Sequence, residues 1–179
     1  PDKMAGAVSE CFRLRISVQP ADVNRSDAYF TIDKAEMGKQ CIRFGLAAVK
    51  NVGEGAIRPI LEEREKGGPF TSIHDFCSRA DLRGVNRRTL ESLIRVGAFD
   101  AFGSRGAIDD ATQEILSFAQ SEADRRERGQ SSLFDGMTDV DDVGQMARIV
   151  IGDRETLPRE KVTWEKELLG LSLSNGSLS

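Results

Sequence analysis

Over its first 45 residues the chain alternates between a short helical pattern and short extended patterns. Apolar side chains at helical spacing predict a helix over residues 4–14. Three short apolar runs, at residues 16–20, 28–32 and 41–44, predict three short strands, with a polar turn between the last two. A piece of this size is too small for a hydrophobic core of its own, so we expect it to pack on something larger.

From residue 46 onward the apolar spacing becomes that of amphipathic helices. Two segments follow one plan, in which a helix, a turn of small residues and a second helix succeed one another. The two turns are Asn51-Val52-Gly53 and Gly84-Val85-Asn86, and helices are expected after them over residues 56–65 and 87–96. A supersecondary unit that occurs twice in tandem is more informative than a single copy.

Local signals mark where these helices begin and end. Ser72 is followed three residues later by Asp75, which predicts a capped helix start. Gly67-Gly68 before a proline, and Gly97 after the last apolar residue, predict helix ends.

The C-terminal third has a long helix, a polar stretch and a short helix in its pattern. A helix is expected over residues 106–128, with a break at Gly129. Residues 137–157 are acidic and punctuated by glycine, which predicts a flexible linker, and residues 158–170 predict a helix with Trp164, Leu168 and Leu169 inward. The expected fold class is mainly α, with a small N-terminal α+β piece of short strands and a partly flexible C-terminal segment.

Composition excludes several functions. Only 6% of the 179 residues are aromatic, which argues against an aromatic platform for sugars or single strands. Cys11, Cys41 and Cys77 are far apart and His74 is the only histidine, so neither a metal site, a disulfide framework nor a catalytic triad is expected. No apolar run reaches the length that crosses a bilayer, and we expect a cytoplasmic protein without membrane contact.

The whole chain has a net charge of −4, but its positive charge is concentrated in one region. Residues 43–99 hold ten Lys and Arg against seven Asp and Glu, whereas residues 100–160 hold seven against fourteen. Glycine turns before helices let a phosphate approach the free amides at the helix start. Two such turns can hold both strands of a duplex through the backbone alone, without reading sequence. The candidate DNA-binding residues are Lys50, Asn51, Val52, Gly53, Gly55, Arg83, Gly84, Val85, Asn86, Arg87 and Arg88.

A plainer interpretation is that the glycines only shape helical hairpins and that the charges are solvated faces. Glu54 counts against DNA binding, because a carboxylate beside a phosphate weakens affinity unless it points away.

Several stretches together closely resemble the tandem helix-hairpin-helix region of bacterial DNA polymerase III alpha subunits, the C-family replicative polymerases. The flanks agree with that family as well: residues 20–27 are similar to its segment at the end of the fingers, and residues 164–171 to the stretch before its OB-fold domain. The stretches that carry the main resemblance are Lys50-Asn51-Val52-Gly53-Glu54-Gly55-Ala56-Ile57, Gly68-Pro69-Phe70, Asp75-Phe76-Cys77, Val85-Asn86-Arg87-Arg88-Thr89-Leu90-Glu91-Ser92-Leu93-Ile94 and Gly97-Ala98-Phe99-Asp100.

The resemblance implies a division into the end of the fingers (1–45), a tandem helix-hairpin-helix domain (46–128), a peptide segment (129–136) and an acidic linker with a short helix leading toward the OB domain (137–179). It implies a parent DNA-directed DNA polymerase, a nucleotidyltransferase whose Mg²⁺ ions are held by palm aspartates upstream of residue 1. The chain itself is expected to be an inert fragment with no catalytic residue, metal or cofactor. The family continues with His-Pro near the C-terminus, and residues 173–179 lack that pair.

A second candidate site is the peptide Gln130-Ser131-Ser132-Leu133-Phe134. It resembles the Gln-x-x-Leu-Phe peptide with which bacterial proteins dock on the β sliding clamp, and it stands where the alpha subunit has its own. Leu133 and Phe134 would be the apolar anchors and Gln130 the polar contact. The alternative is that both apolar side chains pack on the preceding helix.

The resemblance therefore implies duplex DNA, the sliding clamp, the remaining polymerase domains and the other replicase subunits as partners. Three other hypotheses stay open: a packing module with little DNA contact, the helix-hairpin-helix domain of a repair enzyme, and the same region of an error-prone paralogue.

Overall fold

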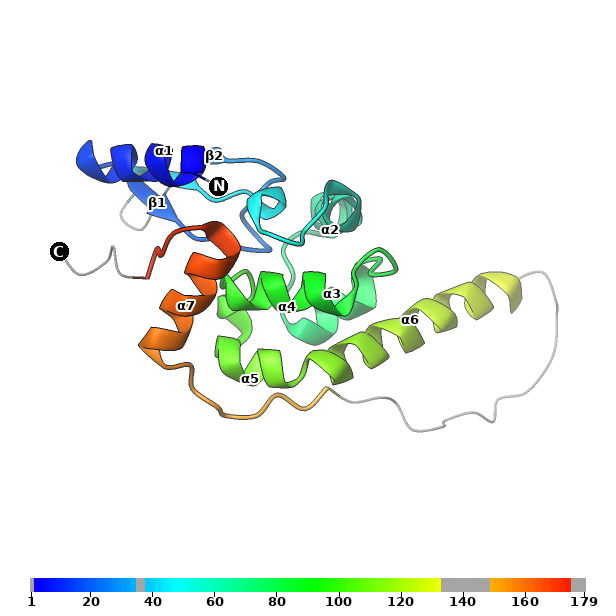
Figure 1. Cartoon of the computed structure of the whole chain (residues 1–179). Coiled ribbons are helices and arrows are strands. Elements are labelled where there is room, and N and C mark those ends of the chain that lie inside the picture. Colours follow the sequence, from blue (N-terminus) through cyan, green and yellow to red (C-terminus); the bar gives the residue numbers. More distant parts are fainter. Residues whose placement is uncertain (1, 35–37, 133–148, 175–179) are drawn as a thin grey trace.

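The computed structural model describes residues 2–34, 38–132 and 149–174 (Figure 1). Within them the fold is mainly α with one small sheet, as predicted. The elements are α1 (Asp2–Arg13), β1 (Ser17–Gln19), β2 (Thr31–Lys34), β3 (Gln40–Arg43), the 3₁₀ turn η2 (Leu46–Ala48), α2 (Glu54–Gly67), α3 (Ile73–Arg79), α4 (Arg87–Arg95), η3 (Asp100–Phe102), α5 (Arg105–Asp110), α6 (Thr112–Ser132) and α7 (Pro158–Leu169).

The sheet has the strand order β1-β3-β2, with β1 parallel and β2 antiparallel to β3. All three predicted strands are present, but the second begins only at Thr31. Residues 28–30 were expected in this strand and are not part of it. The reason is that the carbonyl groups of Asp27 and Ala28 accept hydrogen bonds from the amides of Leu46 and Ala47.

The N-terminal piece shares one hydrophobic core with the helices. Phe44 in this piece is fully buried, as are Ile57 of α2 and Phe76 of α3, and all three belong to one cluster. The Arg64 guanidinium of α2 donates hydrogen bonds to the carbonyl oxygens of Val23 and Ser26, at 3.0 and 2.7 Å. Arg64 is therefore a structural tie between α2 and the N-terminal piece.

The two tandem units differ in their first helix. The second unit consists of α3, the turn at 84–86 and α4, as predicted. The first unit has only η2 where a longer helix was expected, because Val49 is extended (ψ 130°) and Asn51 adopts a left-handed conformation (φ +68°). The predicted helix starts are confirmed: Ser72 Oγ accepts a hydrogen bond from the amide of Asp75, and Asn86 Oδ1 from that of Thr89.

The C-terminal helices depart from the expected boundaries. The helix expected over 106–128 is divided at Ala111 into α5 and α6, and α6 runs through Gly129 to Ser132. The predicted break at Gly129 is wrong, because one exposed glycine costs a helix only about 1 kcal/mol. In Figure 1, α6 extends away from the rest of the helices.

Part of the expected linker packs on the helices. Ile149 is buried in the common core, and Thr156 Oγ1 accepts a hydrogen bond from the amide of Gly106 at 2.7 Å. Residues 137–148 of that linker lie outside the described residues. Helix α7 forms where it was predicted, with Leu168 and Leu169 buried and Trp164 half-buried.

Candidate nucleic-acid interface

The fold brings the two turns together, although they lie far apart in the sequence. A Cβ atom added to Gly84 would lie 3.6 Å from the carbonyl oxygen of Gly55, so the second turn packs against the start of α2. The Asn51 carbonyl oxygen accepts a hydrogen bond from Thr89 Oγ1 at 2.9 Å, and Asn51 Nδ2 donates one to Ser92 Oγ at 3.1 Å. The first turn is thereby attached to α4, and the starts of α2 and α4 are neighbours.

Within these turns the apolar residues point inward and the others face solvent. Val52 and Val85 are buried, at 7% and 5% exposure, so their side chains anchor the turns and only their backbone can meet a ligand. The exposed members of the predicted site are Lys50, Asn51, Gly53, Gly55, Arg83, Gly84, Asn86, Arg87 and Arg88. The structure therefore groups all the predicted DNA-binding positions at one place.

Gly53 and Gly55 are not required by the fold itself. Gly53 has φ −95° and ψ 154°, which any residue adopts, and Gly55 lies in the first turn of α2. An added Cβ at either position would meet no atom within 4 Å. Their missing side chains leave the backbone at the start of α2 open to the outside, where a helix N-terminus attracts anions.

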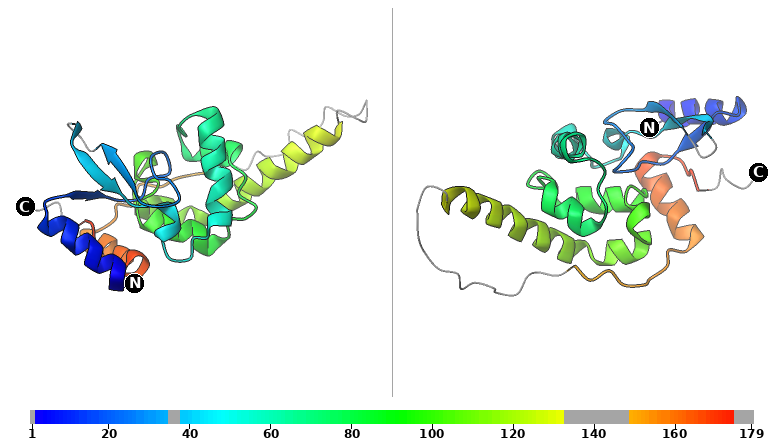
Figure 2. Two further views of the ribbon diagram at one scale, coloured as in Figure 1. Left: turned by 90° about the horizontal axis from the view of Figure 1, so that it is seen from above. Right: turned by 180° about the vertical axis from the view of Figure 1, so that it is seen from behind.

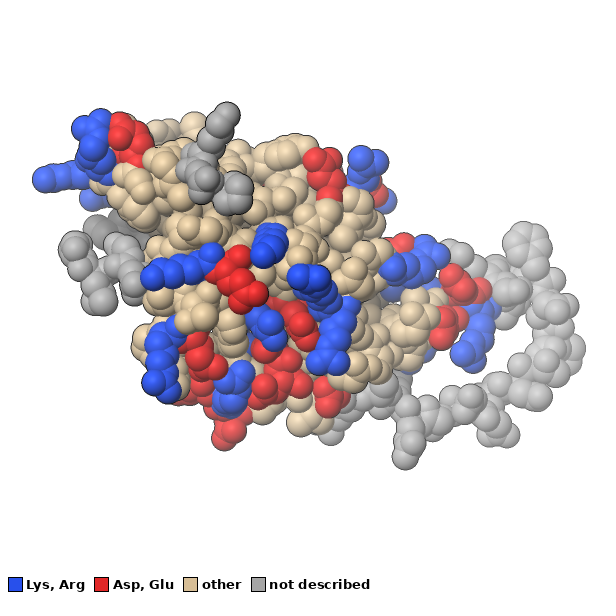
Figure 3. Space-filling view, in the orientation of Figure 1, with Lys and Arg blue, Asp and Glu red and all other residues tan. Residues whose placement is uncertain are grey.

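The basic side chains near the turns are of two kinds. The Arg83 guanidinium donates three hydrogen bonds to the Asp81 carboxylate, and Arg87 pairs with Glu91 at 2.8 Å. The side-chain hydrogen bond from Arg83 lowers the pKa of Asp81 to about 2, so this pair stays ionised at neutral pH. On the face drawn in Figure 3, basic and acidic side chains are likewise interspersed. The positive charge at the site is therefore local.

Other basic side chains are exposed without such pairing. In the part of the chain that the structure describes, Lys50, Arg58 and Arg88 are exposed and take part in no ion pair. Arg58 was not among the predicted residues, although it lies one turn along α2 from Gly55. A basic residue three positions after a glycine at a helix start is the signal that would have found it.

The Glu54 side chain contacts Tyr29 of the N-terminal piece. Its carboxylate accepts a hydrogen bond from the hydroxyl of Tyr29. This hydrogen bond raises the pKa of Tyr29, which keeps its proton in the contact. The carboxylate that counted against DNA binding is thus engaged by another group.

Only the first three residues of the second predicted site lie within the part of the chain that the structure describes. The backbone of Gln130, Ser131 and Ser132 forms the last turn of α6. Leu133 and Phe134, the expected anchors, lie outside the described residues. The geometry therefore fixes where this peptide starts and nothing more.

The remaining candidate residues are the cysteines and His74. Over residues 2–34, 38–132 and 149–174, no group of three or more His, Cys, Asp or Glu side chains is placed to hold a metal ion. In the same ranges no helix is both long and apolar enough to span a membrane. Burial raises the pKa of the Cys77 thiol to about 12, and His74 is exposed with its ring 5.2 Å from that of Phe118.

Comparison with known proteins shows similarity to one motif family and to one polymerase subunit. The family model of the helix-hairpin-helix motif matches residues 15–108. The chain is 42% identical over 176 residues to DNA polymerase III subunit alpha of Thermus aquaticus, covering 97% of this chain and 13% of that protein. The same subunit of Deinococcus radiodurans is 41% identical over 179 residues, covering 99% and 13%, and that of Escherichia coli is 38% identical over 135 residues, covering 74% and 11%.

The chain spans only about an eighth of the length of these relatives. Its matched region contains both turns together with η2, α2, α3 and α4 around them. The chain therefore belongs to the helix-hairpin-helix motif family, and it is the counterpart of one segment of DNA polymerase III subunit alpha.

Proposed function

We propose that this chain binds duplex DNA without sequence preference, as a non-catalytic segment of the replicative polymerase. One observation carries the proposal: two exposed helix starts lie side by side, and the fold does not require a glycine at Gly53 or Gly55. The site takes phosphate groups, because helix N-termini offer free amides and partial positive charge to anions. Lys50, Arg58 and Arg88 add full charges around the same point.

Recognition of this kind reads the backbone of the duplex. Neighbouring helix starts can each hold one phosphate, and contacts to phosphates fix position without distinguishing bases. Because Arg83 and Arg87 already have acidic partners, they contribute less than unpaired cations would. We therefore expect weak binding that depends on salt.

A salt titration of duplex binding tests the proposal. If about four phosphates are neutralised, the logarithm of the binding constant should fall against the logarithm of salt concentration with a slope of about −3.6. Two duplexes of scrambled sequence should bind equally. Arg88→Gln should weaken binding more than Arg128→Gln, which removes the same charge from the exposed far end of α6. Undetectable binding at low salt, or equal effects of the two variants, would refute it.

For the whole protein we propose the activity of its relatives' class, DNA-templated DNA synthesis in the cytoplasm. The resemblance implies that the palm aspartates that hold Mg²⁺ lie outside this chain. The part of the chain described here accordingly supplies binding and position. Its expected partners are the DNA, the remaining polymerase domains and the other replicase subunits.

We propose sliding-clamp docking for Gln130–Phe134. The peptide begins in the last turn of α6, directly after the exposed residues Arg128 and Gly129, and its pattern supplies two adjacent apolar anchors. Leu133→Ala with Phe134→Ala should abolish clamp binding and leave the melting temperature unchanged, whereas Ser131→Ala with Ser132→Ala should leave both unchanged. A double anchor variant that melts several degrees lower and a wild type that never binds clamp would contradict docking.

A packing module with little DNA contact is the second candidate function, and one observation favours it. Large apolar side chains are exposed on the N-terminal piece, among them Leu14 at 54% and Ile32 at 77%. Such side chains are suited to contact with another protein surface. If the folded chain shows no detectable DNA binding at any salt concentration, this second function is favoured.

A further inference from the structure

Helix α7 packs against the proposed DNA-binding site from the side opposite α2. In Figures 1 and 2 it lies between the N-terminal piece and the pair α4 and α5. The amide of Lys50 donates a hydrogen bond to the carbonyl oxygen of Leu168 at 3.0 Å. Lys50 immediately precedes the left-handed Asn51, so the last turn of α7 holds the residue just before the first turn.

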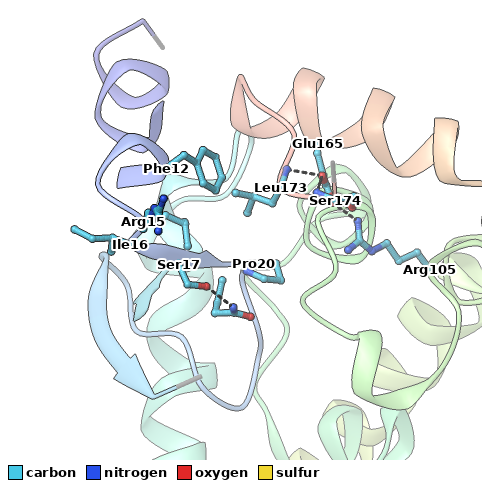
Figure 4. Close-up of a pocket in the computed structure, with 11 residues that line it drawn as sticks. Phe12, Arg15, Ile16, Ser17, Pro20, Arg105, Glu165, Leu173 and Ser174 are labelled. Atoms are coloured by element: carbon cyan, nitrogen blue, oxygen red, sulfur yellow. Dashed lines mark hydrogen bonds and ion pairs between the residues drawn. The ribbon is translucent and has the colours of Figure 1, made fainter. Parts of the chain in front are cut away.

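Glu165, one turn before Leu168, fixes the position of α7. Its side chain is 1% exposed, although charged residues are rarely buried to this degree. Its carboxylate accepts hydrogen bonds from Arg105 Nη1 at 2.8 Å and from the amides of Leu173 and Ser174 at 2.8 and 2.9 Å (Figure 4). The hydroxyls of Ser172 and Ser174 donate to it as well. Glu165 thereby joins α7, α5 and the segment after α7.

The same network reaches the far end of α4. Arg105 Nη1 also donates to the carbonyl oxygen of Arg95, the last residue of α4, at 3.2 Å. The Arg95 guanidinium stacks over the Trp164 ring, 5.6 Å from its centre. Helix α4 carries the second turn at its other end and holds Asn51 through Thr89. Both turns are therefore attached to α4, and α4 is linked through Arg105 to Glu165 of α7.

Stability alone does not account for this arrangement. A buried ion pair loses about as much in desolvation as it gains, and apolar residues of similar volume often serve equally well. The hydrogen bonds of Glu165, however, restrict α7 to one position relative to α5 and the segment after α7. Burial opposes ionisation of Glu165, but hydrogen bonds from Ser174 and Arg105 outweigh it and lower its pKa, so the carboxylate persists.

We propose that Glu165 is a positioning residue for DNA binding, which sets α7 so that the Leu168 carbonyl holds the Lys50 amide and with it the first turn. The proposal rests on the proposed DNA binding at this turn. The ligand is the same duplex backbone, and Glu165 acts on it only through the turn.

Glu165→Gln tests the proposal against Glu167→Gln, which removes the same charge from an exposed position of α7. Charge alone predicts that both variants bind duplex DNA slightly more tightly, because each loses one negative charge. Positioning predicts that Glu167→Gln does so, whereas Glu165→Gln binds about five-fold more weakly or worse. The two interpretations thus differ in the sign of the effect.

Hydrogen exchange gives a readout that a general loss of stability would not reproduce. In Glu165→Gln the Lys50 amide should lose protection, while the Leu90 amide, bonded to the Asn86 carbonyl within α4, keeps it. Should Glu165→Gln fail to fold, Ser172→Ala removes a single hydrogen bond to the same carboxylate and should show both effects in milder form.

The outcomes separate the two proposals. Unchanged Lys50 exchange and tighter DNA binding in the Glu165→Gln and Ser172→Ala variants would overturn the positioning role while leaving DNA binding intact. A wild type that binds no duplex would refute the proposed function and the role in DNA binding together, and the Lys50 exchange would still report whether Glu165 holds the turn.

Discussion

Replacing Gly55 with alanine should move stability and DNA affinity in opposite directions. Gly55 is the second residue of α2, and an added Cβ would meet no atom of the protein within 4 Å. The fold therefore accepts the methyl group without rearrangement. A phosphate seated on the amides at the start of α2 would not, because the methyl group occupies the space it needs.

Both magnitudes follow from this geometry. Alanine is favoured over glycine within a helix by about 0.5–1 kcal/mol, and near a helix start the lower value applies. In a chain of this length that gain raises the melting temperature by about 1–2 °C. A hydrogen bond between an amide and a charged group is worth about 1.5–3 kcal/mol, so loss of one phosphate contact should weaken duplex binding about ten-fold or more.

Thermal unfolding and a fluorescence titration with a short duplex measure the two effects. Gly6→Ala is the matched control, since Gly6 is an exposed residue within α1 and also has no neighbour within 4 Å of an added Cβ. It should gain similar stability and leave DNA affinity unchanged. Unchanged affinity of Gly55→Ala beside a raised melting temperature would show that no phosphate approaches this backbone.

Three further predictions concern the fold around the site. Arg64→Ala should lower stability by about 2 kcal/mol, measured by urea unfolding, because it removes the hydrogen bonds to two backbone carbonyl groups, whereas Lys66→Ala on the same helix should be neutral. Desolvation tends to raise the pKa of Asp33, but hydrogen bonds from a backbone amide, Arg43 and a second arginine lower it to about 2. The ionised carboxylate should therefore contribute about 1 kcal/mol of stability above pH 4, which is lost as the pH falls toward 2. Asp33→Asn should remove this part of the pH dependence of the melting temperature. Cys77, with its pKa near 12 and no exposed surface, should resist thiol reagents at pH 8 until the chain unfolds, and rapid labelling of the folded protein would contradict its placement in the core.

Arg64 also shows that an arginine cannot be chosen as a control for charge from its sequence position alone. By its sequence position it lies well along α2, away from the turns, and reads as a solvated charge. The structure ties it to the N-terminal piece through the carbonyl groups of Val23 and Ser26. Only an exposed residue such as Lys66 or Arg128 is a fair control for charge.

The sequence by itself determined the local features of this protein. Ser72 caps a helix as predicted, and Asn86 caps the helix that was predicted to follow it, since a side-chain oxygen three residues before an amide needs nothing from elsewhere in the chain. Gly97 ends its helix with φ +93°, a conformation that glycine adopts without strain. Val52 and Val85 are inward at the two turns because an apolar residue between polar ones has one favourable side.

Only the tertiary structure decided which charges are buried and which turns meet. Glu165 and Arg105 are of residue types that usually lie at the surface, yet both are buried and form an ion pair at 2.8 Å across 60 positions of sequence. The approach of Gly84 to Gly55 likewise depends on how separate helices pack. Periodicity and caps are set by neighbours within one or two turns of chain, whereas pairing of distant polar groups depends on a compact arrangement that no local pattern encodes.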